Sequence, residues 1–181
     1  MLEIIAVIFI LISVWLTRKQ NIWCWLTGII GTGCYFFIFK EDKSWGNMVL
    51  QLIFIAQGLY GWLIWGKKDT KDVTQSKSVY LTIGCLLTGL LFILLCSINL
   101  TFDFKLGYFD MITTSLSLAA ITLTAHKKLE SWIYWAIANS IYVVFFITSG
   151  HYWSAALYLV LFINTYFGYK EWKSYISQPT Y

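Results

Sequence analysis

The sequence predicts an all-α integral membrane protein with seven transmembrane helices, arranged as three helices, one linking helix and three further helices. Only 12% of the 181 residues are charged and 59% are hydrophobic, whereas a soluble domain carries about 25% charged residues. Long apolar stretches follow one another with short polar connections between them. The pattern of the first part of the chain also returns in the last part.

Seven stretches have the composition and, give or take a few residues at each end, the length to cross a bilayer as helices, which takes about 20 residues. The connections between them are too short to hold a soluble domain. The predicted spans cover residues 2–17, 22–39, 47–65, 79–98, 110–125, 132–149 and 152–169.

The first three predicted spans differ in their polar content. The first, 2–17, ends at a basic pair, and the second, 22–39, holds only small polar side chains besides its tyrosine. The third, 47–65, carries the carboxamides of Asn47, Gln51 and Gln57. Polar side chains inside spans are the main functional evidence in a membrane protein, so the third span is of interest.

The last four predicted spans follow the same logic. The fourth, 79–98, has few polar side chains and suits a linking helix. The fifth, 110–125, is rich in serine and threonine, which commonly pack helices together. The sixth and seventh each carry one carboxamide near the middle, Asn139 and Asn164.

The positions of lysine and arginine predict the orientation, because cytoplasmic connections carry an excess of them. With the N-terminus outside and the C-terminus inside, three basic residues (Lys40, Lys43 and Lys105) face outward. The inner side then carries Arg18, Lys19, Lys67, Lys68, Lys71, Lys77, Lys127, Lys128, Lys170 and Lys173. The net charge of +4 reflects this bias and does not indicate a nucleic-acid partner.

An internal repeat is visible in the sequence. Segments 22–39 and 132–149 align with Trp25 opposite Trp135, at an offset of 110 residues. Segments 47–65 and 154–172 align at an offset of 107, across a loop three residues shorter. This second alignment pairs Gln57 with Asn164, Gly61 with Gly168 and Trp65 with Trp172.

The repeat predicts a single transporter domain made of two parallel halves. Three spans leave the chain on the opposite side of the membrane, and a linking helix restores the direction for the second triple. The halves then cover about 2–65 and 110–172, with the linker at about 79–98. This is the SWEET-like arrangement, in which a substrate site usually lies between the halves near the midplane.

A candidate substrate site centres on the sixth span. Trp135, Asn139 and Tyr142 share one face of the predicted helix, together with Trp132 and Phe146. Aromatic faces around an amide suit a planar ring compound, because rings stack and an amide both donates and accepts hydrogen bonds. The alternative is that Asn139 bonds to a neighbouring helix and only holds the bundle together.

Other in-span residues extend the candidate site. Gln57 and Asn164 occupy equivalent repeat positions, which predicts that they approach the symmetry axis together or form interhelical hydrogen bonds. Gln51 corresponds to Tyr158 in the same alignment. Four aromatic residues at span ends are instead interpreted as anchors at the membrane interface: Trp62, Trp65, Tyr169 and Trp172.

Enzyme, metal and cofactor functions have no support in the sequence. There is no P-loop, no HExxH motif and no nucleophile with a matching histidine, and His126 and His151 both fall in connections. The four cysteines lie inside spans without CxxC spacing, which favours packing. No carboxylate lies at mid-membrane, which argues against a proton- or sodium-coupled pump.

The residues also resemble a known family. LEIIAVIFILISVWLTRKQNIWCWLTGIIG, LYGWLIW, DMITTSLSLAAITLTAHKKLESWIYW and LYLVLFINTYFGYKEW are similar to the PnuC family of bacterial transporters for vitamins and their precursors, chiefly nicotinamide riboside. The family's WxxxN signature falls on Trp135 and Asn139, and its YGW turn on Tyr60, Gly61 and Trp62.

The resemblance implies facilitated diffusion across the bacterial inner membrane, with a cytoplasmic kinase that phosphorylates and traps the substrate. Members are often homotrimers. Thiamine and riboflavin transporters of the same family remain alternatives, as do a SWEET-type sugar transporter and a non-transporting receptor or scaffold. The candidate substrate-binding residues are Trp25, Gln51, Gln57, Tyr60, Trp135, Asn139, Tyr142, Tyr158 and Asn164.

Overall fold

The computed structural model describes residues 1–41, 43, 45–67, 73–74, 79–102 and 107–176. Within these ranges the chain forms seven α-helices and no named strand, as the sequence predicts. The helices are α1 (Leu2–Arg18), α2 (Trp23–Glu41), α3 (Trp45–Lys67), α4 (Val79–Phe102), α5 (Tyr108–Ala125), α6 (Ser131–Thr148) and α7 (Tyr152–Ile176). Among the basic residues that predict the orientation, Lys68, Lys71, Lys77 and Lys105 lie outside the described residues.

The predicted spans and the helices agree closely except at the end of α7. The predicted span ends at residue 169, whereas the helix continues to Ile176. Hydropathy detects the apolar part of a helix but not its polar continuation. The added turns carry Glu171, whose carboxylate pairs with Arg18 at the end of α1 and with Lys19, the residue that follows α1.

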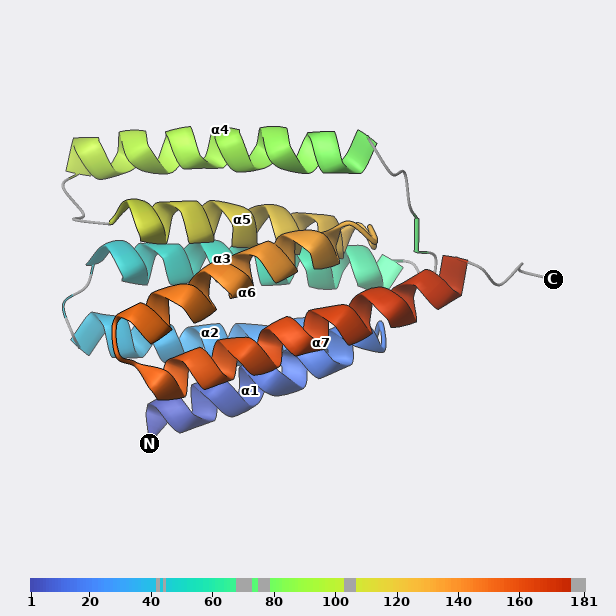
Figure 1. Ribbon diagram of the computed structural model, residues 1–181, viewed down its shortest axis with the longest axis horizontal. Coiled ribbons are helices and arrows are strands. Elements are labelled where there is room, and N and C mark those ends of the chain that lie inside the picture. Colours follow the sequence, from blue (N-terminus) through green and yellow to red (C-terminus); the bar gives the residue numbers. More distant parts are fainter. Residues whose placement is uncertain (42, 44, 68–72, 75–78, 103–106, 177–181) are drawn as a thin grey trace.

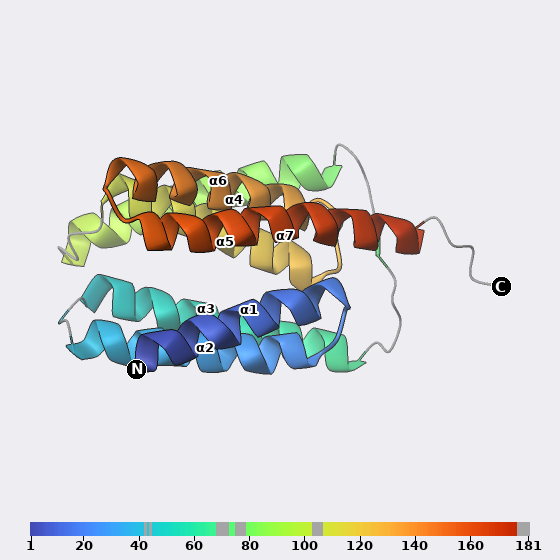
Figure 2. The ribbon, with the colours of Figure 1, turned by 60° about the horizontal axis from the view of Figure 1, so that its bottom comes forward.

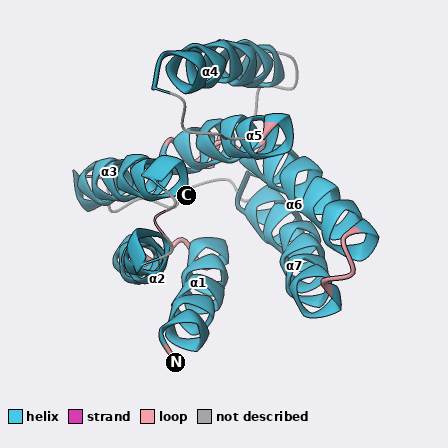
Figure 3. Ribbon diagram, turned by 90° about the vertical axis from the view of Figure 1, so that its left-hand side faces the viewer, coloured by secondary structure: helices cyan, strands magenta, loops and turns pink. Residues whose placement is uncertain are grey.

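The helices form two units of three with α4 beside them. Within the first unit α1 packs on α2 and α2 on α3, and within the second α5 packs on α6 and α6 on α7. The units meet along two seams, one between α3 and α5 and the other between α1 and α7. Figure 3 shows these contacts end-on, with α4 packed on α5 outside the ring of six helices. Figure 2 separates α1–α3 from the second unit.

The start of α1 and the end of α7 lie at opposite ends of the bundle (Figure 1). Large apolar side chains cover much of the outside, especially along α4, where Leu86, Leu90 and Ile93 are exposed. By length and composition alone, the described helices include three candidate membrane spans, at Asn47–Lys67, Thr82–Phe102 and Ser131–Thr148. These surfaces are those of a protein that lies in lipid.

A set of side-chain contacts occurs twice, at positions 107 residues apart. The ring of Trp25 packs edge-on against Trp65 with 5.3 Å between ring centroids, and Trp132 packs in the same way against Trp172 at 5.4 Å. A Cβ atom added to Gly61 would clash with the Trp25 ring. One added to Gly168 would clash with the Trp132 ring. Each glycine therefore makes room for an indole.

The turns before α2 and α6 also recur at this spacing. Gln20 and Lys127 both have left-handed backbones, with φ of 51° and 53°. The Trp25 amide bonds to the Ile22 carbonyl, as the Trp132 amide bonds to that of Leu129. The alignment of Trp25 with Trp135 is therefore wrong by three residues, because Trp132 makes the contacts that correspond to those of Trp25. The alignment of Trp25 with Trp135 matched aromatic residues only, whereas the turns before α2 and α6 determine which positions of the two helices correspond.

Trp65 and Trp172 are core residues, so their interpretation as interface anchors is wrong. Trp65 is 5% exposed and Trp172 is fully buried. The Trp65 indole donates to the Ala125 carbonyl of α5 over 2.9 Å, and the Trp172 indole donates to the Thr17 and Arg18 carbonyls of α1 over 3.2 Å. Each indole thus bonds to the last turn of a helix in the other three-helix unit, α5 for Trp65 and α1 for Trp172.

Val73 and Thr74, the residues described between α3 and α4, pack onto the same tryptophan core and its neighbouring turn. Val73 is 8% exposed and belongs to the buried cluster that contains Trp65 and Trp172. Thr74 pairs with the α5–α6 turn through two backbone hydrogen bonds. The Thr74 amide donates to the Lys127 carbonyl over 3.2 Å, and the Leu129 amide donates to the Thr74 carbonyl over 3.2 Å. The core near the C-terminal end of the bundle therefore has contributions from both units and this connection.

Candidate functional site

The predicted face of α6 lies between α5 and α7. Near the start of α6 the Trp135 indole donates a hydrogen bond to the Thr124 hydroxyl of α5 over 3.2 Å. Further along, the Tyr142 ring meets Phe109 of α5 edge-on at 5.5 Å and stacks on Tyr158 of α7 at 4.4 Å between centroids. Tyr142 and Tyr158, which come from different predicted spans, are thus brought into direct contact.

Asn139 lies on this face between Trp135 and Tyr142 and is 7% exposed. Among the hydrogen bonds of the described residues, none involves its carboxamide. The carboxamide is not among the fully enclosed side-chain polar atoms that lack a partner, so it keeps some accessible surface through which a ligand could bond to it. The interpretation of Asn139 as interhelical packing requires a partner on a neighbouring helix, and the described residues supply none.

Gln57 and Asn164 lie on different seams and bond across them. The Gln57 amide donates to the Thr122 hydroxyl of α5 over 3.2 Å. The Asn164 carbonyl oxygen accepts from Nη1 of Arg18 over 3.0 Å. The two carboxamides therefore do not pair with each other, and the interhelical bonding predicted as one alternative is present.

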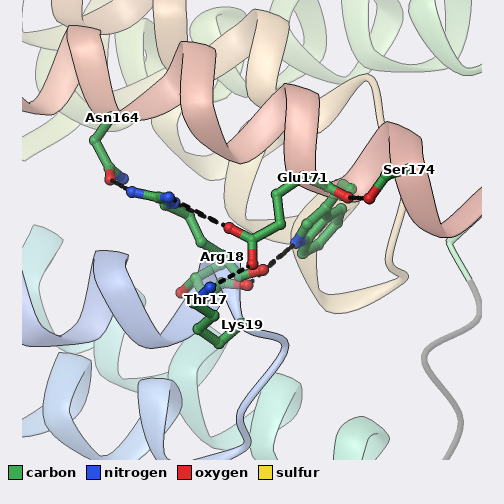
Figure 4. Close-up of polar contacts among 7 residues, drawn as sticks. Thr17, Arg18, Lys19, Asn164, Glu171 and Ser174 are labelled. Atoms are coloured by element: carbon green, nitrogen blue, oxygen red, sulfur yellow. Dashed lines mark hydrogen bonds and ion pairs between the residues drawn. The ribbon is translucent and has the colours of Figure 1, made fainter.

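A polar network that the sequence did not reveal joins α1 to α7 (Figure 4). Arg18 donates through Nε and Nη2 to one Glu171 oxygen at 3.3 Å, and Lys19 donates to the other at 2.8 Å. The Arg18 guanidinium also lies 5.4 Å from the centroid of the Phe167 ring. The sequence does not reveal the partners of Arg18 and Lys19, because these partners lie about 150 residues away in the chain.

The seam between α3 and α5 carries an uncharged contact between Tyr60 and His126. The Tyr60 hydroxyl lies 3.0 Å from Nε2 of His126. Burial, with a smaller contribution from the Lys128 charge, lowers the pKa of His126 below its ordinary value. The neutral imidazole is therefore favoured at neutral pH, and its unprotonated nitrogen can accept a hydrogen bond from the Tyr60 hydroxyl.

No hydrogen bond or ring contact of the described residues joins the remaining candidates to Asn139. Trp25 is buried in the tryptophan core against Trp65. Tyr60 is 43% exposed, and Gln51 is partly buried on α3. Where the structure describes side chains, no group of three or more histidine, cysteine, aspartate or glutamate residues is placed to hold a metal ion.

The fold and these contacts define a class: a membrane protein whose described residues form seven helices, with amides and aromatic rings at helix contacts both within the second three-helix unit and between the two units. Residues 1–174 match the family model described as nicotinamide mononucleotide transporter. The chain belongs to this family of membrane transporters.

Named relatives and a solved structure agree. The chain is 24% identical to the nicotinamide riboside transporter PnuC of Escherichia coli strain K12, over 94% of this chain and 84% of the relative. The Shigella flexneri protein of the same name gives the same values. The fold is similar to a crystal structure of the vitamin B3 transporter PnuC, with a TM-score of 0.83 and 16% identity over 97% of this chain and 82% of that one.

These comparisons confirm the family resemblance. The family consists of transporters, so the prediction that the protein is not an enzyme is confirmed as well. The structural likeness, at 16% identity, bears on the fold alone.

Proposed function

We propose that the protein takes up nicotinamide riboside. The observation that carries this proposal is the family match over residues 1–174, together with relatives named for that substrate over nearly the whole chain. The Asn139 carboxamide lies between Trp135 and Tyr142 on α6 and has no hydrogen-bond partner among the described residues. It suits the carboxamide of a nicotinamide ring, since two amides can each donate a hydrogen bond to the other.

A riboside fits these side chains better than the mononucleotide in the family description. A phosphate group calls for a free cationic side chain in the transport path. Arg18 contacts the candidate Asn164, and its guanidinium is engaged by Glu171 and Asn164. The substrate is therefore a nucleoside without phosphate.

Transport proceeds by facilitated diffusion through a SWEET-like 3-1-3 parallel repeat. The contacts that recur 107 residues apart support two equivalent halves around α4. The described acidic side chains lie at or near helix ends, so none is placed at mid-membrane to couple transport to protons or sodium. A cytoplasmic kinase then phosphorylates the substrate and keeps it inside.

The protein lies in the inner membrane of a bacterium with its N-terminus outside and its C-terminus in the cytoplasm. The excess of basic residues at the α1–α2, α3–α4 and α5–α6 connections supports this orientation. By the family resemblance, three copies assemble into a homotrimer.

Calorimetric titration of the purified protein tests the substrate. Nicotinamide riboside, thiamine and riboflavin are each titrated into the same preparation. The proposal expects saturable binding that is tightest for nicotinamide riboside. Tighter binding of thiamine or riboflavin would assign the chain to another branch, and a folded protein that binds none of the three would favour a receptor or scaffold.

A further inference from the structure

Four indole rings cross the interface between the two units, near the end of the bundle where α1, α3, α5 and α7 finish. Trp25, Trp65, Trp172 and Trp132 follow one another, with 5.3, 6.4 and 5.4 Å between successive ring centroids. None of the four is more than 5% exposed. The middle contact joins Trp65 of the first unit to Trp172 of the second. The rings therefore form one buried core that both units share.

Two hydrogen bonds hold this core across the seams, and they are equivalent in the repeat. The Trp65 indole donates to the carbonyl of Ala125, the last residue of α5, over 2.9 Å. The Trp172 indole donates to the carbonyl of Arg18, the last residue of α1, over 3.2 Å. The two donors are 107 residues apart, and so are the two acceptors. Because the last carbonyls of a helix have no partner within the helix, each indole supplies the partner from the other unit.

The opposite end of the α3–α5 seam is held by a different kind of contact. Leu50 of α3 and Met111 of α5 are 5% and 2% exposed, and both belong to an apolar cluster with Leu95 of α4. Apolar side chains can separate without breaking hydrogen bonds. Separation of the units at the tryptophan core breaks an indole bond on each seam.

We propose that Trp65 and Trp172 are the two latches of a gate that closes the transport path at the cytoplasmic end. A nucleoside cannot pass between rings in contact, so the units must part here to release substrate into the cell. Because Trp65 touches Trp172, parting the units disturbs both latches together. The gate rests on the proposed function for the substrate that passes it, and on the proposed orientation for its side of the membrane.

The plain alternative is that the indoles only stabilise a rigid core. Two native cysteines separate the two interpretations without any substrate. Cys24 is 2% exposed and belongs to the tryptophan core, whereas Cys96 packs against the cluster of Leu50 and Met111. Two versions of the full-length protein each keep one of these cysteines, with the other cysteines changed to alanine. The rate of labelling by N-ethylmaleimide then reports opening at each end.

The latches predict that Trp65→Phe and Trp172→Phe, which keep a ring but lose the donor, each speed labelling of Cys24. The increase should be about two- to tenfold, the effect of one hydrogen bond. Labelling of Cys96 should not change. Trp153→Phe, which replaces a 92% exposed tryptophan of α7, is the matched control and should change neither rate.

Two labelling results would overturn the gate. One is an unchanged rate at Cys24 in both latch variants. The other is an equal increase at Cys24 and Cys96, because general destabilisation exposes both ends alike.

A reversible crosslink tests the gate with both indoles in place. The Lys19 amine lies 2.8 Å from the Glu171 carboxylate, beside the Trp172 latch (Figure 4). In a variant without native cysteines, Lys19→Cys and Glu171→Cys are joined by a short bifunctional thiol reagent that a reductant cleaves. Crosslinking should block uptake of nicotinamide riboside into liposomes, and reduction should restore it. Lys170→Cys with Lys173→Cys, both exposed on α7, is the control, and its crosslink should leave uptake unchanged.

Uptake that continues after complete crosslinking of positions 19 and 171 would overturn the gate. Failure of the proposed function gives a different result. In that case no uptake occurs before crosslinking, and the labelling of Cys24 still tests the latches.

Discussion

Asn139 is the residue on which the proposed substrate site depends most. Its spacing from Trp135 and Tyr142 is visible in the sequence, and the structure places all three between α5 and α7. The sequence could not decide between ligand contact and packing, because both call for an amide inside a span. The lack of a described hydrogen-bond partner favours the ligand.

Replacing Asn139 with alanine should therefore weaken substrate binding without destabilising the fold. Loss of one hydrogen bond in a dry site costs about 1–3 kcal/mol, which corresponds to roughly ten- to a hundredfold in affinity. Affinity for nicotinamide riboside and melting temperature are measured on the same preparation. The control is Ser140→Ala, since the Ser140 hydroxyl bonds to the Ala136 carbonyl of its own helix. A lower melting temperature with normal affinity would make Asn139 a packing residue.

Gly61 and Gly168 test the recurring tryptophan contacts. Alanine at either position would place a Cβ atom too close to an indole ring, and overpacking of this kind costs about 1–3 kcal/mol. Gly33→Ala is the control, because an added Cβ there meets nothing within 4 Å. Thermal unfolding in detergent should show a lower midpoint for both test variants and an equal or higher one for the control. Unchanged midpoints for Gly61→Ala and Gly168→Ala would contradict the described packing.

At the scale of helices, hydropathy was sufficient to predict how many there are and roughly where they begin and end. It was not sufficient for the register of the repeat, because aromatic residues recur at several helical spacings and the turns at Gln20 and Lys127 decide between them. Nor could it distinguish Trp65 and Trp172 from interface anchors. The equal spacing of Gly61 from Trp65 and of Gly168 from Trp172 was the available signal.

The ion pair between Arg18 and Glu171 should contribute modestly to holding α1 against α7. Both side chains are about one-fifth exposed, so we expect a coupling of about 1 kcal/mol, near the upper end for ion pairs in contact with solvent. A double-mutant cycle with Arg18→Met and Glu171→Gln measures it through thermal unfolding. The coupling should fall as salt is raised. Lys170→Gln, a charge change on the exposed side of α7, is the control, and zero coupling at low salt would contradict the pairing.

For the whole molecule, the sequence predicted the class and family, but only part of the candidate site. The Tyr142–Tyr158 contact lies within one unit and follows from helical spacing on neighbouring helices. The contacts across the seams, such as Arg18 with Asn164 or Tyr60 with His126, join residues far apart in the chain. Their pairing depends on how the two units meet, which no local pattern specifies.

The orientation is a prediction for the whole chain. A reporter active only in the cytoplasm, fused after Tyr181, should give signal, because the inner side then carries the larger share of basic residues. The same reporter fused before Met1 should be silent, since the start of α1 and the end of α7 lie at opposite ends of the bundle (Figure 1). A silent C-terminal fusion on a folded protein would reverse the proposed topology.

The central claim is passive transport of nicotinamide riboside, and uptake into liposomes that contain only the purified protein tests it most directly. Labelled substrate should enter faster than into protein-free liposomes and stop when the inner and outer concentrations are equal. Enclosing a nicotinamide riboside kinase with ATP should then drive further accumulation of the phosphorylated product. Accumulation of unmodified substrate above the outer concentration on imposing a proton or sodium gradient would contradict the account, as would uptake no faster than in protein-free liposomes.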